Sequence, residues 1–166
     1  MSLPGWLGGL SLLVWLVLVL GRAWFWRPGP WLPPAVAREG RWPAVAVVIP
    51  ARNEAALLPR TLPGVLGQDY PGELRIFLVD DHSDDGTADT ARNLDRHGRL
   101  SVLAAPPLPP GWTGKLWALQ QGVERSDAAF LLFTDADIAH PPDLLRRLVA
   151  RALADDLDLV SVMARL

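Results

Sequence analysis

The hydrophobic pattern divides the chain into a uniformly apolar N-terminal stretch and a longer part in which short apolar runs alternate with amphipathic segments. The β-branched run 45–49 is typical of a strand buried on both faces. Similar apolar runs predict strands over 74–79, 100–104, 128–133 and 157–163. Between them, helices are predicted from Asn53, as N-cap, to about residue 66, and over 87–97, 115–125 and 141–155. Alternating strands and helices predict an α/β fold with a parallel sheet and right-handed crossovers.

The helix predicted over 115–125 is expected to be amphipathic. Leu116, Leu119 and Val123 recur at helical spacing and are the expected buried positions. The run 128–133 is expected to be a buried strand.

The N-terminal stretch 3–20 has no charged residue and is dominated by Leu, Val and Trp. As a helix it would be roughly 27 Å long, close to the apolar thickness of a bilayer. Tryptophans border it and arginines follow it, a distribution that predicts a membrane anchor with the rest of the chain in the cytoplasm. The residues concerned are Trp6, Trp24, Trp26, Arg22, Arg27, Arg38 and Arg41. A cleaved signal peptide would need a basic leading region and a small-residue cleavage site, and neither is found.

Three segments are therefore expected. Residues 1–26 form the anchor, residues 27–43 form a stiff juxtamembrane linker rich in Pro and Trp, and residues 44–166 form the cytoplasmic domain.

Composition excludes several kinds of site. The chain has 166 residues, a net charge of −2 and no Cys. Near-neutrality gives no indication of nucleic-acid binding. The lack of Cys excludes disulfides, thiolate catalysis and thiolate metal sites. Three widely spaced His residues do not resemble a zinc-binding set.

The most informative residues are Asp135 and Asp137, which follow the apolar run 128–133. In an extended segment residues i and i+2 point the same way, so the two carboxylates repel each other unless a cation lies between them. Mg²⁺ and Mn²⁺ prefer oxygen ligands and often complete their coordination with substrate phosphates. A metal–diphosphate site is one interpretation, and solvated turn residues that cap the following helix are the other. His140, three residues after Asp137, is expected to fill the loop, with a position lining the metal site as the alternative.

Polar segments follow three of the predicted strands, at 52–54, 80–85 and 135–137. Ligands of open parallel sheets bind at the carboxyl ends of the strands. Because all three segments fall at such ends, we expect them to converge on one rim of the sheet.

Four sequence blocks, VAVVIPARNE, FLVDDHSDDGT, GKLWALQQG and FLLFTDADI, occur in an order that resembles family 2 glycosyltransferases. The resemblance covers about residues 44–166 and implies a GT-A, Rossmann-like nucleotide-diphospho-sugar transferase fold. The anchor, the Pro/Trp-rich segment and the block PPLPPGWTGKLWALQQG are most similar to the hopanoid-associated glycosyltransferases of bacteria. The resemblance then implies transfer of a sugar from a nucleotide donor, expected to be a UDP-sugar, to a lipid acceptor.

The resemblance also implies residue roles. Asp81 would hydrogen-bond the base, usually uracil, with Asp80 supporting its loop, and Lys115 would lie near the ribose and diphosphate. Asp135 and Asp137 would hold Mg²⁺ or Mn²⁺ on the diphosphate. The remaining residues of the implied nucleotide pocket follow the first strand and are Pro50, Arg52 and Glu54.

Alternatives stay open for individual residues. Arg52 can be a surface residue paired with Glu54, and Lys115 an ordinary exposed residue at a helix start. Asp84 or Asp85 is predicted to cap the helix that begins at Thr87.

An inverting transferase needs a general base to deprotonate its acceptor. The resemblance places that acid after the fifth strand, so we expect it beyond Leu166 and interpret the chain as a C-terminally truncated fragment that carries the donor half. Other readings are a polyprenyl-phosphate glycosyltransferase, a non-catalytic nucleotide-binding module and, remotely, a phospho-receiver domain with Asp135 as phosphoacceptor.

Overall fold

The computed structural model describes residues 3–21, 32, 40–96 and 98–162, which belong to two compact units, Pro33–Val160 being the larger. The smaller unit contains helix α1 (Leu3–Leu16), which continues as the π-helical turn η1 (Val17–Gly21). Its window Pro4–Gly21 has a mean hydropathy of 1.9 over 18 residues, which is long and apolar enough to cross a membrane. A signal sequence would meet the same criteria, so anchoring stays a prediction.

Part of the predicted membrane border lies outside the described residues. This applies to most of the linker 27–43 and to Arg22, Trp24, Trp26, Arg27 and Arg38.

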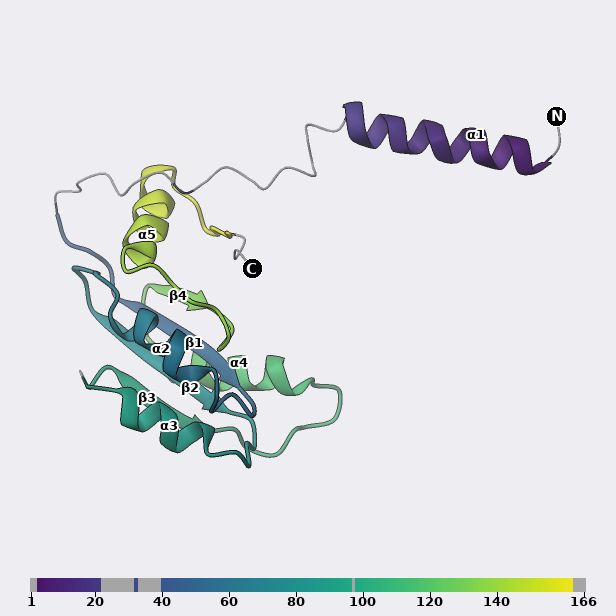
Figure 1. The fold of residues 1–166 in the computed structure, drawn as a ribbon. Coiled ribbons are helices and arrows are strands. Elements are labelled where there is room, and N and C mark those ends of the chain that lie inside the picture. Colours follow the sequence, from purple (N-terminus) through teal and green to yellow (C-terminus); the bar gives the residue numbers. More distant parts are fainter. Residues whose placement is uncertain (1–2, 22–31, 33–39, 97, 163–166) are drawn as a thin grey trace. The chain divides into compact units, whose positions relative to one another are not determined.

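The larger unit is built on a parallel four-stranded sheet with the order β3-β2-β1-β4 (Figure 1). Its strands are β1 (Val45–Ala51), β2 (Leu74–Asp80), β3 (Leu100–Ala104) and β4 (Phe130–Phe133). Strand β1 lies between β2 and β4, and residues 45–49 are at most 2% exposed, as the continuous apolar run predicted. The α/β class and these four strands are confirmed.

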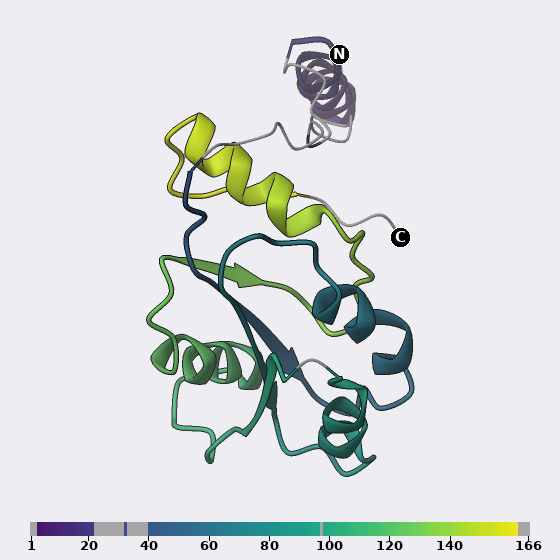
Figure 2. The same ribbon diagram turned by 90° about the vertical axis from the view of Figure 1, so that its left-hand side faces the viewer.

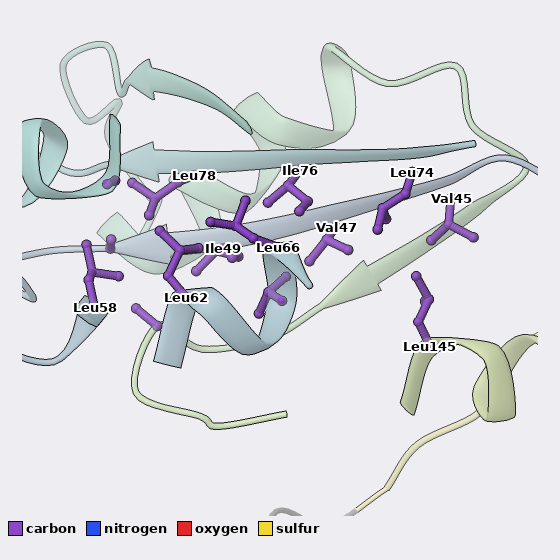
Figure 3. Packing of buried hydrophobic residues seen from close by; sticks show 14 of the residues in the cluster. Val45, Val47, Ile49, Leu58, Leu62, Leu66, Leu74, Ile76, Leu78 and Leu145 are labelled. Carbon is purple, nitrogen blue, oxygen red and sulfur yellow. The ribbon is translucent and has the colours of Figure 1, made fainter. Parts of the chain in front are cut away.

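Helices cover both faces of the sheet. They are α2 (Leu58–Leu66), α3 (Thr87–Leu94), α4 (Gly114–Glu124) and α5 (Leu144–Ala154). Val45, Val47 and Ile49 point to the face on which α2 and α5 pack, and Figure 3 shows Leu62 and Leu145 approaching this row. Ala46 and Val48 point to the other face and pack with Ala118 of α4. Figure 2 shows α4 on the opposite side of the sheet from α2 and α3.

The predicted apolar face of α4 is only partly confirmed, because Leu119 packs against the cluster of Ala46 and Val48 but Leu116 does not. Leu116 is 55% exposed, whereas Ala118 and Gly122 are buried. A Cβ on Gly122 would lie 2.9 Å from Val48 Cγ2. The helix therefore approaches β1 through its smallest residues, a preference that a count of large apolar side chains misses.

Strand β4 is less buried than predicted, because it forms an edge of the sheet. Leu131 is 38% exposed and Phe133 is 50% exposed. Both pair in register with residues of β1 that face α4, namely Ala46 and Val48, but α4 does not extend over them.

The predicted fifth strand is wrong for residues 157–162, which form no strand, while residue 163 lies outside the described part. Helix α5 ends in a Schellman-type turn: Asp156 has a φ of 52°, and Leu157 N donates to Ala152 O at 2.8 Å. This turn redirects the chain, and Leu159 is left 83% exposed. Helix α5 itself begins at Leu144, later than predicted, because Pro142 disfavours helical backbone at Pro141.

Candidate functional site

The carboxyl ends of β1, β2 and β4 meet at one end of the sheet (Figure 1). Successive strands β1, β2 and β3 run outward in one direction, and β4 lies on the other side of β1. The strand order therefore reverses between β1 and β4, and open α/β sheets bind ligands at such a switch point.

A cavity of about 310 Å³ lies at this point. It collects seven of the eight site residues expected from the sequence. These are Pro50, Arg52, Glu54, Asp81, Lys115, Asp135 and Asp137, and Ala51 and Ala136 complete the wall. The expected convergence of three polar segments on one rim is confirmed, while their binding roles stay predictions.

Pro50 opens the cavity on the side of β4. Ala44 O and Val48 O accept hydrogen bonds from Phe130 N and Thr134 N. The backbone N–H and C=O groups of every second residue along this segment therefore face β4. Pro50 continues this alternation, but the pairing of β4 with β1 ends at Phe133. The missing N–H of proline therefore costs no ladder hydrogen bond there, and the gap becomes part of the cavity.

Asp81 is the most buried carboxylate of the cavity, with 13% of its side chain exposed. Its N donates to Ala51 O at 2.8 Å, which ties it to the end of β1. Its oxygens lie 3.5 Å from Arg52 Nη1 and 3.1 Å from His82 Nδ1. Gly114 faces the same carboxylate, and a Cβ at this position would overlap Asp81 Oδ2.

Two consequences follow for the alternatives left open by the sequence. Arg52 pairs with Asp81 and not with Glu54. Lys115 is also more than an exposed residue at a helix start, because its Nζ lies 2.7 Å from Asp135 Oδ1 across the cavity.

Asp80 is the one expected site residue that does not line this cavity. It is half-buried at the end of β2, and its Oδ1 has no hydrogen-bond partner among the described residues. Its carbonyl accepts a hydrogen bond from Ala105 N at 2.9 Å, which fits the supporting role expected for it.

The loops after β1 and β2 are cross-linked. Asn53 N donates to Ser83 Oγ at 2.9 Å, and Asn53 Oδ1 accepts from Asp84 N at 3.1 Å. Asn53 has a φ of 57° and is not a helix N-cap, because α2 begins only at Leu58. The predicted cap is therefore wrong, and the residue instead joins two loops of the rim.

The N-cap of α3 is Gly86, so the predicted capping role of Asp84 or Asp85 is wrong. Asp85 instead joins the start of α3 to the loop after β1. Its Oδ1 accepts from Thr87 N at 3.0 Å, and its Oδ2 accepts from Ala55 N at 3.0 Å. The hydrogen bond from the Thr87 hydroxyl is the main reason that the pKa of Asp85 lies below its usual value.

Negative charge accumulates at the mouth of the cavity. The pKa of Glu54 is raised, first by desolvation and then by the charges of Asp137, Asp85 and Asp135. Four carboxylates and only two cationic side chains line the cavity. Uncompensated carboxylates that raise the pKa of a neighbour mark a place where a cation would be stabilised.

The residues of the cavity can supply only part of the coordination of a divalent cation. Among the described residues, no three His, Asp or Glu side chains converge on one metal position. Asp135 and Asp137 offer hard oxygen atoms, and Mg²⁺ commonly uses one or two carboxylates with substrate phosphates and water. The donor set therefore suits a cation that binds together with a diphosphate.

His140 stays outside the cavity. Its Nε2 lies 2.8 Å from Thr134 Oγ1, and burial lowers its pKa. Within the described chain it joins the two ends of the loop that carries the acidic pair, in agreement with the expected filling role.

Gly114 was not among the expected site residues, although glycine next to a lysine at a helix start signals close backbone approach. Thr61, whose hydroxyl donates to Ala136 O at 2.6 Å, was not among them either. A polar residue among the apolar Leu58, Leu62 and Val65 of α2 was the available signal.

The strand order also excludes a phospho-receiver domain. Receivers have the order 2-1-3-4-5, in which the first strand neighbours the third. Here β1 neighbours β2 and β4.

Comparison with known proteins places the cavity in a wider context. A family model described as glycosyl transferase family 2 matches residues 46–165. The glycosyltransferase AglE of Haloferax volcanii is 32% identical over 71% of this chain and 38% of its own length. The beta-monoglucosyldiacylglycerol synthase of Synechocystis sp. is 26% identical over 82% of this chain and 33% of its own.

Among solved structures, the mannosyltransferase PcManGT from Pyrobaculum calidifontis, in complex with GDP-Man and Mn²⁺, superposes with a TM-score of 0.60. The two proteins are 26% identical, and the match covers 88% of this chain and 40% of the mannosyltransferase. The chain thus spans about a third of the length of the curated relatives it matches.

Proposed function

The chain belongs to glycosyl transferase family 2, and on this premise we propose that it forms the donor-binding half of a glycosyltransferase. The complete enzyme would transfer a sugar from a nucleoside diphosphate sugar to a lipid acceptor. The observation that carries the proposal is the single cavity that gathers the ends of β1, β2 and β4.

The proposed donor site has two ends. Asp81 would accept an N–H of the base, expected to be uracil, with Arg52 beside it. Lys115 would contact the diphosphate, to which its ammonium group is suited as a compact positive charge. Pro50 and Glu54 would line the wall between these ends.

Asp135 and Asp137 would hold Mg²⁺ or Mn²⁺ at the diphosphate end. When bound, such a cation stabilises the negative charge that grows on a diphosphate leaving group. The protein's own contribution is to fix the two carboxylates on one wall and to supply Lys115 as a second positive charge.

A lipid acceptor is supported by two observations. The apolar window Pro4–Gly21, formed by α1 and η1, is long enough to place the domain at a bilayer, with the domain proposed to lie on the cytoplasmic side. One relative is named for the synthesis of a glucosyl diacylglycerol. We propose a hopanoid as the acceptor because of the sequence blocks quoted above, and polyprenyl phosphate as the alternative lipid.

The decisive experiment is a binding titration with the full chain in detergent micelles. We expect UDP and UDP-sugars to bind with Mn²⁺ and to bind much more weakly without it, and GDP-mannose serves to test the choice of base. Asp135→Ala and Asp137→Ala should each abolish the metal-dependent gain in affinity. Asp89→Ala removes an exposed carboxylate of α3 and should bind like the parent.

Equal affinity with and without Mn²⁺, or parent-like binding by both Ala variants, would contradict the proposal. Binding without any transfer activity in the complete protein would favour the non-catalytic nucleotide-binding module.

A further inference from the structure

One face of α2 packs against the loop between β4 and α5, which carries Asp135 and Asp137. Thr61 and Gly64 lie at positions i and i+3 of α2 and therefore share this face, and Gln68 follows shortly after the helix ends at Leu66. Thr61 is 6% exposed and Gln68 is 5% exposed, so both polar side chains are removed from solvent. Buried polar groups of this kind are retained where they have specific partners.

Thr61 contacts the peptide between the two acids. Its hydroxyl donates to Ala136 O at 2.6 Å, and this hydrogen bond is buried. The alternative acceptor, Leu57 O, lies farther away at 3.3 Å. Because the Ala136 carbonyl belongs to the peptide unit that leads into Asp137, its orientation sets the direction of the second carboxylate relative to the first.

Gly64 and Gln68 hold the rest of the loop. A Cβ on Gly64 would lie 2.8 Å from His140 O, so only glycine allows this approach. Gln68 Nε2 donates to Pro141 O at 2.7 Å, and its Oε1 accepts from Leu145 N at 2.8 Å. The far end of the loop is thereby fixed at the C-terminal end of the same helix.

Between residues 135 and 139, by contrast, the loop depends on Thr61. Within the described chain, the Thr61 hydroxyl is the one group outside the loop that hydrogen-bonds this backbone. Among the described residues, the backbone of 135–139 otherwise makes only local hydrogen bonds, in which Asp135 O accepts from Ile138 N at 3.5 Å and from Thr134 Oγ1 at 3.4 Å.

We propose that Thr61 is a positioning residue for the divalent cation, an inference that rests on the proposed donor site. Thr61 touches neither the cavity nor the cation, and it acts by fixing the Ala136 peptide so that Asp135 and Asp137 present their oxygens together. Gln68 anchors the same loop at its other end. Groups that orient metal ligands in this way commonly change metal affinity by about 10- to 100-fold when they are removed.

The test uses the full chain in detergent and three variants. Thr61→Val keeps the shape but removes the hydroxyl, and Thr61→Ser keeps the hydroxyl. Thr90→Val makes the same change on α3, at a half-buried threonine away from the loop. Mn²⁺ affinity is measured by electron paramagnetic resonance in the presence of UDP, UDP affinity is measured without metal, and unfolding is followed separately.

We expect Thr61→Val to weaken Mn²⁺ binding by at least about 10-fold. UDP affinity without metal should be unchanged, because Asp81 and Arg52 are not displaced. Thr61→Ser and Thr90→Val should bind Mn²⁺ like the parent. Should Thr61→Val fail to fold, Thr61→Cys, with its weaker donor, should show a smaller loss in the same assay.

Parent-like Mn²⁺ affinity in Thr61→Val would overturn the inference. A loss of metal-free UDP affinity as large as the loss of Mn²⁺ affinity would also overturn it, because it would indicate a general structural role for Thr61. A parent chain that binds no Mn²⁺ with UDP would instead overturn the proposed function, and the inference with it.

Discussion

Replacing Gly114 by alanine should weaken UDP binding while leaving the stability of the fold nearly unchanged. Gly114 is the first residue of α4, and its missing side chain leaves room for the carboxylate of Asp81. A methyl group there would overlap Asp81 Oδ2 and lie 3.4 Å from Asp81 Cγ. The carboxylate is the end of a side chain and can rotate away, so the backbone of α4 need not move.

The expected magnitudes differ for stability and for binding. Alanine in a helix is favoured over glycine by up to about 1 kcal/mol, which offsets the cost of moving the carboxylate. We therefore expect little change in the free energy of unfolding. A hydrogen bond to a charged group contributes about 1.5–3 kcal/mol, so a displaced Asp81 should weaken UDP binding by about 10- to 150-fold.

The assay is a double-mutant cycle with Asp81→Ala, measured by UDP titration of the full chain and by chemical unfolding. If Gly114→Ala acts through Asp81, the double variant should bind no more weakly than Asp81→Ala alone. Additive losses, or unchanged binding in Gly114→Ala, would refute the reasoning. A large loss of stability would show that the backbone, and not the carboxylate, gives way.

Two further predictions concern charge and packing. Because the raised pKa of Glu54 means that its ionised form is disfavoured in the folded chain, stability should fall as the pH rises through that pKa. Glu54→Gln should therefore unfold at a higher temperature than the metal-free parent at neutral pH, a difference that disappears below about pH 4, and an unchanged melting profile would contradict this. Gly122→Ala places a Cβ 3.2 Å from Val48 Cβ and should destabilise the domain by about 1–3 kcal/mol in urea unfolding. Val48→Ala in the same chain should recover part of that loss, whereas a parent-like Gly122→Ala would refute the close packing.

The sequence was sufficient for the sheet and for the position of the site because both depend on local patterns. Continuous apolar runs located β1 and β2 to within two residues. Acids placed directly after such runs must lie at strand ends, and parallel strands bring those ends to one edge. The convergence of Asp81 with Asp135 thus followed from topology alone.

The errors arose in two ways, because contacts between distant segments decide the structure at Asn53 and a local turn decides it after α5. Asn53 looks like a helix cap, yet hydrogen bonds to Ser83 and Asp84 hold it in the left-handed region. The run after α5 looks like a strand, but a left-handed Asp156 turns the chain away from the sheet. The partners of Asn53 lie about 30 residues away along the chain and cannot be read from its neighbours, and nothing in the apolar run 157–163 indicates the turn that precedes it.

The electrostatics of the cavity connect the two ligands of the proposed site. Lys115 neutralises Asp135 in the absence of ligand, and both side chains are about half exposed, at 59% and 50%. An ion pair so exposed contributes little stability, so a diphosphate can draw Lys115 away at small cost. That exchange leaves Asp135 beside Asp137 without a counter-charge, the condition in which a divalent cation binds best. Diphosphate and cation should therefore favour each other's binding by the same factor, because coupling between two bound ligands is reciprocal.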